Sequence, residues 1–256
     1  MTSIELDNVS VWYSLRGKYA PVKREILKSP ISSSAQIGAN IAVGHQNRAT
    51  VAQPLNGLSL SIREGDALGL IGGNGSGKTT LLKVITGCLQ PQQGTVKIDG
   101  SVTSLLSMHG GVNPELSGYE NIIQRALWLG YSRQEINEKI DAIAAETGLG
   151  EYLRMPIKIY SAGMNARLVF ATVTAFQPEI LIMDEGIIVG DEQFQRTARA
   201  RVAELLEKTG IVVMASHSTE LLRKNCTHGL WLDNGTPKKF GPIEDVLDHY
   251  RSSLAK

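Results

Sequence analysis

One octapeptide limits the fold of this chain more than any other stretch. Gly72 to Thr79 read Gly-Gly-Asn-Gly-Ser-Gly-Lys-Thr, which satisfies the phosphate-loop pattern G-x-x-x-x-G-K-[ST] in full. The apolar run Ala67–Ile71 precedes it, and Thr79–Thr86 follows with helical periodicity before Gly87. A phosphate loop needs this order of strand, glycine-rich turn and helix. The sequence therefore predicts an α/β protein that binds a nucleotide.

The residue types in this loop suit phosphate chemistry. Glycines let backbone N–H groups approach phosphate oxygens, and the N-terminus of the following helix adds partial positive charge. Lys78 is expected to reach the β and γ phosphates, and the Thr79 hydroxyl to ligate Mg²⁺. A glycine-rich turn without a ligand is the alternative, and the flanking elements disfavour it. The predicted ATP-binding residues are Gly72, Asn74, Gly75, Ser76, Gly77, Lys78, Thr79 and Thr80.

Composition excludes several other classes of protein. A chain of 256 residues suits one large α/β domain, alone or with an insertion, and its net charge of +1 gives no bulk attraction for nucleic acid. The two cysteines, Cys88 and Cys226, form neither a metal-binding cluster nor a disulfide framework, which indicates a reducing compartment. No signal peptide is visible at the N-terminus, and the longest apolar runs fall far short of the roughly 20 residues of a membrane span. We do not expect the chain to cross a bilayer by itself.

The pattern of strands and helices predicts three parts. Alternating apolar residues indicate strands at Ile4–Val11 and Leu58–Ile62. Two capping-box pairs, Ser117 with Glu120 and Ser132 with Glu135, begin helices that run to about residues 129 and 147. We expect an N-terminal part of the ATP-binding core at 1–103, a helical subdomain at 104–163 and a C-terminal part of the core at 164–256. A late hairpin at Asn234-Gly235 and a last helix from Ile243 complete the pattern.

Residues 20–54 read as an insertion in the N-terminal part. The segment is rich in Ser, Gln, Asn and Ala, and it has prolines at 21, 30 and 54. A mobile surface excursion is one interpretation, and a contact surface for a partner is the other. The nearby basic residues favour contact with a membrane subunit or lipid head groups, and they are Lys18, Lys23, Arg24 and Lys28.

Polar residues follow two further apolar strands. Asp184 and Glu185 follow Ile180–Met183, where an Asp is suited to the Mg²⁺ shell and its neighbour to orienting or activating water. His217 follows Ile211–Ala215, at the sheet edge where nucleotides bind. Solvated charges and a structural histidine are the alternatives. The preceding phosphate loop favours the catalytic interpretation of Glu185 and His217.

A second anion-ready helix N-terminus lies before these strands. Ser161, Ala162 and Gly163 precede a helix from Met164 and offer a hydroxyl and free backbone N–H groups. An ordinary helix cap is the alternative. By itself the stretch favours the cap, but the order of the surrounding motifs, with one phosphate loop already complete, raises the question of whose phosphate a second anion-ready N-terminus would hold.

The order of these motifs resembles the ATPase subunits of ATP-binding cassette (ABC) transporters. Tyr160-Ser161-Ala162-Gly163-Met164 stands where that family's signature LSGGQ stands. Arg167 and Phe170, then Val189-Gly190-Asp191 and Phe194-Gln195, resemble the polysaccharide exporter branch, as does the stretch Asn113–Gly118. The resemblance covers residues 55 to 250.

The resemblance implies a fold and a dimer. The fold would be the P-loop NTPase fold of ABC ATPases, with a RecA-like core, an antiparallel β subdomain and an α-helical subdomain insert. ATP would lie between the phosphate loop of one subunit and the signature residues Ser161, Ala162, Gly163 and Met164 of the other, in a head-to-tail homodimer. Glu185 would act as general base, His217 would contact the γ-phosphate, and Asp191 would contact the partner. Tyr13 or Trp12 would stack on adenine.

The resemblance also implies a function. Two subunits would dock on a separate dimer of transmembrane permease subunits and drive export of a lipid-linked glycan such as O-antigen, capsule or teichoic acid. They would sit peripherally at the cytoplasmic face of the bacterial inner membrane. An exporter of a drug or lipid is one alternative. A soluble cassette ATPase acting on nucleic acid or ribosomes is the other, and the balanced charge disfavours a nucleic-acid partner.

The sequence departs from the family pattern in three places. No glutamine occurs at Ser107, Met108 and His109, where most cassette ATPases have one that touches Mg²⁺ and water. The segment 20–54 is longer than in a minimal cassette. The chain ends soon after Tyr250, so a separate C-terminal glycan-binding domain, which some relatives carry, is not expected.

Overall fold

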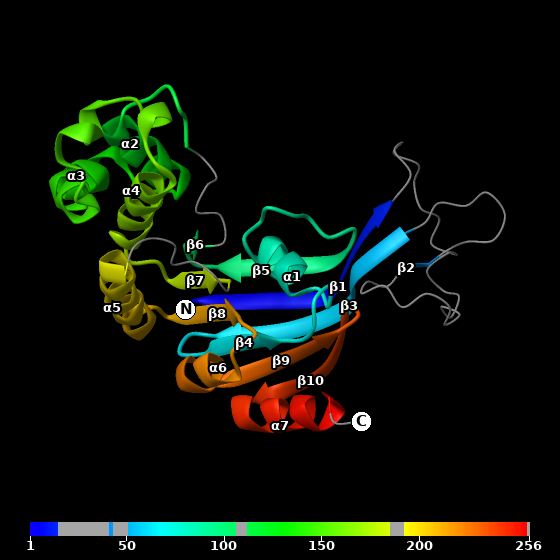
Figure 1. The fold of residues 1–256 in the computed structure, drawn as a ribbon. Coiled ribbons are helices and arrows are strands. Elements are labelled where there is room, and N and C mark those ends of the chain that lie inside the picture. The colour runs from blue at the N-terminus through cyan, green and yellow to red at the C-terminus, as the bar shows by residue number, and fades with distance from the viewer. Residues whose placement is uncertain (15–40, 43–50, 106–111, 185–191, 255–256) are drawn as a thin grey trace. The chain divides into compact units, whose positions relative to one another are not determined.

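The chain forms two compact units in the computed structural model, which describes residues 1–14, 41–42, 51–105, 112–184 and 192–254. The first unit contains Met1–Asp99 and Val213–Lys256, and the second contains Gly100–Val212. Figure 1 shows that strands predominate in the first unit and helices in the second. The chain leaves the first unit once, forms the second, and returns.

An antiparallel sheet makes up one part of the first unit. Its strands are β1 (Ser3–Ser14), β2 (Ile41–Ala42), β3 (Val51–Arg63) and β5 (Gln93–Asp99), in the order β2-β3-β1-β5. Leu6 of β1 lies opposite Leu60 of β3, and the alternating apolar side chains of both strands are buried. The predicted strands are therefore confirmed.

The predicted end of the insertion at Pro54 is wrong. Residues 51–54 belong to β3, and Ala52 lies opposite Tyr13. A proline usually argues against a strand, but β1 is long enough to pair with this stretch, and its register shifts around Val11. Tertiary pairing thus overrides the local composition.

A second group of strands in the first unit carries the phosphate loop. β4 (Ala67–Ile71) pairs in parallel with β9 (His228–Asp233), which forms an antiparallel hairpin with β10 (Thr236–Pro242). The last residues of β8 (Ile211–Ala215) lie on the other side of β4. Asn234 and Gly235 both have positive φ, which confirms the predicted hairpin turn. The helices are α1 (Lys78–Ile85), α6 (Thr219–Asn225) and α7 (Ile243–Leu254), and α7 packs on β9 and β10.

In its described residues, the second unit combines short strands with four α-helices. β6 (Val102–Ser104) and β7 (Ile180–Met183) pair in parallel. The helices are α2 (Gly118–Trp128), α3 (Arg133–Thr147), α4 (Ala162–Thr174) and α5 (Glu192–Lys208). Two short 3-10 helices, η2 (Gly150–Arg154) and η3 (Ile157–Ile159), connect α3 to α4. Both predicted capping boxes are present, since Ser117 and Ser132 cap α2 and α3 with Glu120 and Glu135 as their reciprocal partners.

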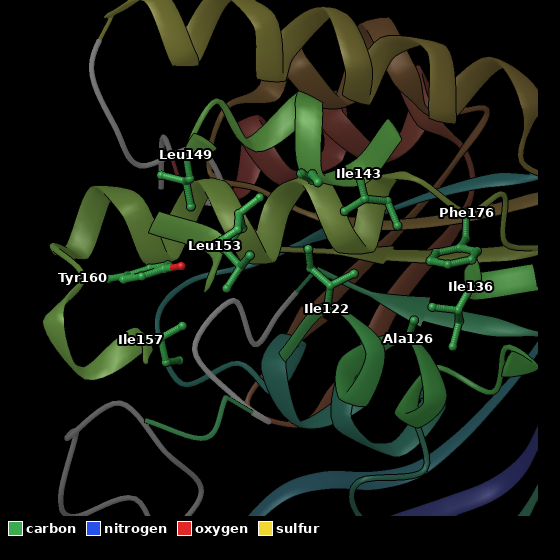
Figure 2. Close-up of a cluster of buried hydrophobic side chains, with 12 residues drawn as sticks. Ile122, Ala126, Ile136, Ile143, Leu149, Leu153, Ile157, Tyr160 and Phe176 are labelled. Carbon is green, nitrogen blue, oxygen red and sulfur yellow. The ribbon is translucent and has the colours of Figure 1, made fainter. Parts of the chain in front are cut away.

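Apolar side chains from α2, α3 and α4 form the core of this helical unit. Figure 2 shows the cluster, with Tyr160 near one end and Phe176 near the other. Ile122 and Ile136 are fully buried. Removal of this surface from water stabilises the packing by roughly 25 cal/mol per Å². Within the described residues, no helix has the length and apolar character that a membrane span requires.

Candidate nucleotide site

The phosphate loop joins β4 to α1 as the sequence predicts. Gly77 caps α1 in a left-handed conformation with φ of 107°. A Cβ at this position would overlap the carbonyl oxygen of Pro54, and one at Gly72 would overlap that of Leu232. Glycine is required at both positions because other parts of the first unit approach the loop backbone closely.

Backbone hydrogen bonds support the loop from two distant segments. The Gly235 N–H in the β9–β10 turn donates to the Ser76 carbonyl at 3.0 Å, and the Asn56 N–H of β3 donates to the Gly235 carbonyl at 2.9 Å. Sequence reasoning missed these supporting residues. An Asn-Gly pair predicts a hairpin turn but gives no sign of what that turn contacts.

The outer face of the loop fits a polyphosphate. Gly73, Asn74, Gly75 and Thr79 are exposed, while Ser76 is buried. The Lys78 Nζ donates to the carbonyl oxygens of Gly72 and Gly73, at 2.7 and 3.0 Å. An ammonium group held against a glycine-rich turn at a helix N-terminus is suited to bind phosphate oxygens. The residues present therefore fit ATP, and the predicted Mg²⁺ residue Thr79 is exposed while Thr80 is half-buried.

Two other predicted contacts lie in the first unit. His217 follows β8 and is exposed; the adjoining Ser218 accepts from the Leu221 N–H at 3.2 Å and caps α6. Tyr13 lies near the end of β1, and 43% of its surface is exposed. The side chains of His217 and Tyr13 are thus accessible to a ligand. Their roles toward the γ-phosphate and adenine stay predictions.

The signature residues form the N-terminus of α4 in the second unit. Ser161 caps the helix, because its hydroxyl accepts from the Met164 N–H at 3.2 Å. The helix begins at Ala162, so the prediction that it begins at Met164 is wrong by two residues; the serine cap draws the preceding residues into the first turn. Ser161 and Ala162 are exposed, and a Cβ at Gly163 would lie 3.8 Å from the Ser161 hydroxyl with nothing nearer.

Three residues that mark the family resemblance lie together behind this N-terminus. The rings of Phe170 on α4 and Phe194 on α5 make an edge-to-face contact at 5.5 Å, and the Arg167 guanidinium lies 5.4 Å from the Phe194 ring centre. Such aromatic and cation–π contacts each contribute about 0.5–1.5 kcal/mol. The middle of α4 thus packs against α5, while Ser161 and Ala162 at its N-terminus are exposed.

Of the remaining predicted residues, the structure describes Asp184 but not the others. Asp184 follows β7 in the second unit and is half-buried. Glu185 and Asp191 lie outside the described residues, as do Ser107, Met108 and His109 and most of the 20–54 segment. The proposed Mg²⁺ residues Thr79 and Asp184 thus belong to different units.

The fold and the loop define a P-loop nucleotide-binding protein. The family model for ABC transporters matches residues 55–187, and the chain belongs to this family. The predicted α/β fold class is confirmed, because solved ABC ATPase domains share the fold.

Several curated relatives are export proteins. The chain is 39% identical to "Teichoic acids export ATP-binding protein TagH" of Staphylococcus saprophyticus, over 82% of this chain and 78% of that protein. It is 36% identical to "O-antigen export system ATP-binding protein RfbE" of Yersinia enterocolitica, over 92% of this chain and 96% of that protein. For "O-antigen export system ATP-binding protein RfbB" of Myxococcus xanthus the identity is 35% over 94% of this chain, which spans only 53% of that protein.

Solved structures agree in fold at lower identity. An ATP-binding subunit of an ABC transporter has a TM-score of 0.67 and 20% identity, with 99% of both chains covered. A dimeric post-hydrolysis state of an ATP-binding cassette bound to ADP and Pi has a TM-score of 0.65 and 18% identity, over 94% of this chain and 98% of that chain. At these identities the likeness supports the fold alone.

Proposed function

We propose that the chain is the ATP-binding and ATP-hydrolysing subunit of an ABC exporter that moves a lipid-linked polysaccharide of the O-antigen, capsule or teichoic acid type. The proposal rests on the export names of relatives that match most of this chain. The observation that carries the ATPase assignment is the phosphate loop, whose exposed Gly73–Gly75 backbone lies beside the Lys78 ammonium.

The active unit is a head-to-tail homodimer. The phosphate loop of one subunit and the N-terminus of α4 of the other bind opposite sides of the same ATP. Exposure of Ser161 and Ala162 supports this arrangement, because a serine-capped helix N-terminus has backbone N–H groups directed outward and attracts anions.

Hydrolysis uses groups from several segments. Lys78 exchanges the carbonyl oxygens of Gly72 and Gly73 for phosphate oxygens as the nucleotide binds. Glu185 accepts a proton from the attacking water, whose oxygen bonds to the γ-phosphorus as the bond to the β-phosphate oxygen breaks. His217 contacts the γ-phosphate and Asp191 the partner. Thr79 and Asp184 would hold Mg²⁺, which would supply positive charge at the phosphate oxygens when bound.

The dimer acts with a separate dimer of transmembrane permease subunits. The subunits attach peripherally to the cytoplasmic face of the bacterial inner membrane, where export-system relatives suggest a permease for them to dock on. ATP binding closes the dimer, and hydrolysis releases it. The insertion, which ends before β3, contacts the permease or lipid head groups.

An allelic replacement tests the function in the bacterium that encodes the chain. Lys78→Ala removes the ammonium of the loop, and we expect at least about a tenfold loss of surface polysaccharide with accumulation of lipid-linked glycan inside the cell. Lys83→Ala is the matched control, because Lys83 is an exposed lysine of the same helix. Normal surface polysaccharide in the Lys78→Ala strain would contradict the export assignment, and retention of a drug or another lipid would favour the alternative cargo.

A further inference from the structure

Tyr160 lies directly before the serine that begins α4, and its side chain is turned back into the helical unit. Only 8% of its surface is exposed, and its ring lies in the apolar cluster beside Leu153 and Ile157 (Figure 2). The phenol Oη donates to the Tyr152 carbonyl oxygen at 2.6 Å. Burial raises the pKa of this phenol above its ordinary value of 10.0, so it remains a donor at neutral pH.

Backbone hydrogen bonds attach the same segment to the entry of α2. The Tyr160 N–H donates to the Ile157 carbonyl at 2.9 Å. The N–H groups of Ile157 and Lys158 in turn donate to the carbonyls of Leu116 and Pro114, each at 3.0 Å. The stretch from Tyr152 to Tyr160 is therefore a closed loop anchored at α2, and the Tyr160 hydroxyl closes it.

The first residue of α2 leaves room for this hydroxyl. A Cβ at Gly118 would lie 2.6 Å from the Tyr160 Oη and 2.8 Å from the Leu153 Cδ2. Any residue larger than glycine must displace both the phenol and the leucine side chain. The buried position of the Tyr160 phenol therefore requires a glycine at position 118.

We propose that Tyr160 is a positioning residue for the signature turn. Its bond to the Tyr152 carbonyl fixes the place of Ser161 and of the first backbone N–H groups of α4, which meet the partner subunit's nucleotide. The inference rests on the proposed function. The hydrogen bond also connects those N–H groups to a segment with exposed apolar side chains, those of Tyr152, Met155 and Ile159.

Tyr160→Phe removes the bond with little other damage. Phenylalanine keeps the buried ring, and the Tyr152 carbonyl retains a second donor, the Met155 N–H at 2.9 Å. No buried acceptor is left without a partner, so the variant is expected to fold. The monomer's affinity for ATP should not change, because the phosphate loop belongs to the other unit.

ATP-driven dimerisation, followed by light scattering with Mg²⁺, tests the proposal. The background is Glu185→Gln, which is expected to retain ATP and stabilise the dimer. Adding Tyr160→Phe should raise the ATP concentration at half-maximal dimerisation about fivefold, because the loosened signature turn must then be ordered when the dimer forms. Tyr131→Phe is the matched control, because Tyr131 packs on the same cluster and its ring stacks on Phe176 at 3.9 Å. Loss of the Tyr131 hydroxyl should change the midpoint by no more than about twofold.

The outcomes separate the two claims. A Glu185→Gln chain that stays monomeric with ATP would overturn the proposed function. If that chain dimerises but Tyr160→Phe leaves its midpoint unchanged, or if Tyr131→Phe shifts it equally, the positioning role is wrong. Gly118→Ala keeps the hydroxyl but crowds it, and it should move the midpoint in the same direction as Tyr160→Phe. An unchanged midpoint in Gly118→Ala would also contradict the role.

Discussion

The two predicted phosphate-binding regions are built in opposite ways. The phosphate loop is supported on its inner side by its own chain, through Pro54, Leu232 and Gly235. The N-terminus of α4 is open, since Ser161 and Ala162 are exposed and Gly163 has space around it. The phosphate loop needs its glycines in order to fold, whereas the fold does not require Gly163 in α4. We therefore expect Gly163 to be the glycine that serves a contact with the partner.

The largest effect is expected when the loop glycine is changed. Gly77→Ala forces a Cβ onto the Pro54 carbonyl at a φ of 107°. Unfolding followed by urea titration should show a loss of about 3 kcal/mol or more, because a clash with backbone adds to strained dihedrals. ATP binding should be lost as well. Gly73→Ala, where a Cβ meets nothing within 4 Å, is the control and should keep its stability.

The matching change in α4 should separate stability from activity. Gly163→Ala lies in the first turn of a helix, where alanine is favoured by up to about 1 kcal/mol. We expect unchanged or slightly higher stability and unchanged ATP binding, but at least about a tenfold loss of hydrolysis, because the added methyl group faces the partner's nucleotide. Equal losses of stability in Gly77→Ala and Gly163→Ala would break the comparison.

A smaller difference between the two units is expected in how their stability depends on acid. Three carboxylates of the second unit accept two hydrogen bonds each from a serine: Glu120 from Ser117, Glu135 from Ser132 and Glu179 from Ser101. These bonds lower the pKa of each carboxyl below its ordinary value of 4.5. The pKa of each carboxyl is therefore lower in the folded chain than in the unfolded chain. The stability that these carboxylates contribute is complete above about pH 4.5 and is lost as the pH falls toward the pKa of the folded state.

Tryptophan fluorescence can locate this acid sensitivity. Trp128 reports on the second unit, while Trp12 and Trp231 report on the first. In single-tryptophan variants, the urea midpoint seen by Trp128 should fall more between about pH 6 and about pH 3.5 than that seen by Trp231. Replacing Glu120 and Glu135 with glutamine should flatten the dependence at Trp128. Equal shifts at both probes would mean that these carboxylates do not set the difference.

Local signals were sufficient for the phosphate loop, two helix starts and one hairpin turn. The octapeptide predicted the loop, the serine–glutamate pairs predicted both capping boxes, and Asn234-Gly235 predicted the hairpin. Each of these features depends on residues close together in the chain.

Contacts between distant segments were not predictable. Nothing near Gly235 shows that its N–H supports Ser76, and the proline at 54 argues against the strand that pairs with β1. The hydrogen bond of Tyr160 was also not predictable, because only the fold brings its hydroxyl to the Tyr152 carbonyl. The structural reason for two glycines at 72 and 77 likewise depends on backbone from β9 and β3.

Cross-linking between the two regions tests the central claim most directly. Cysteines placed at Gly73 and Ile159, two exposed positions next to the predicted nucleotide contacts, can be joined by a short bismaleimide in a chain whose exposed Cys88 is replaced by serine. With ATP and Mg²⁺ in the Glu185→Gln background, the account predicts a covalent dimer, because the loop of one subunit meets α4 of the other. An ATP-dependent cross-link found only within single chains would contradict it.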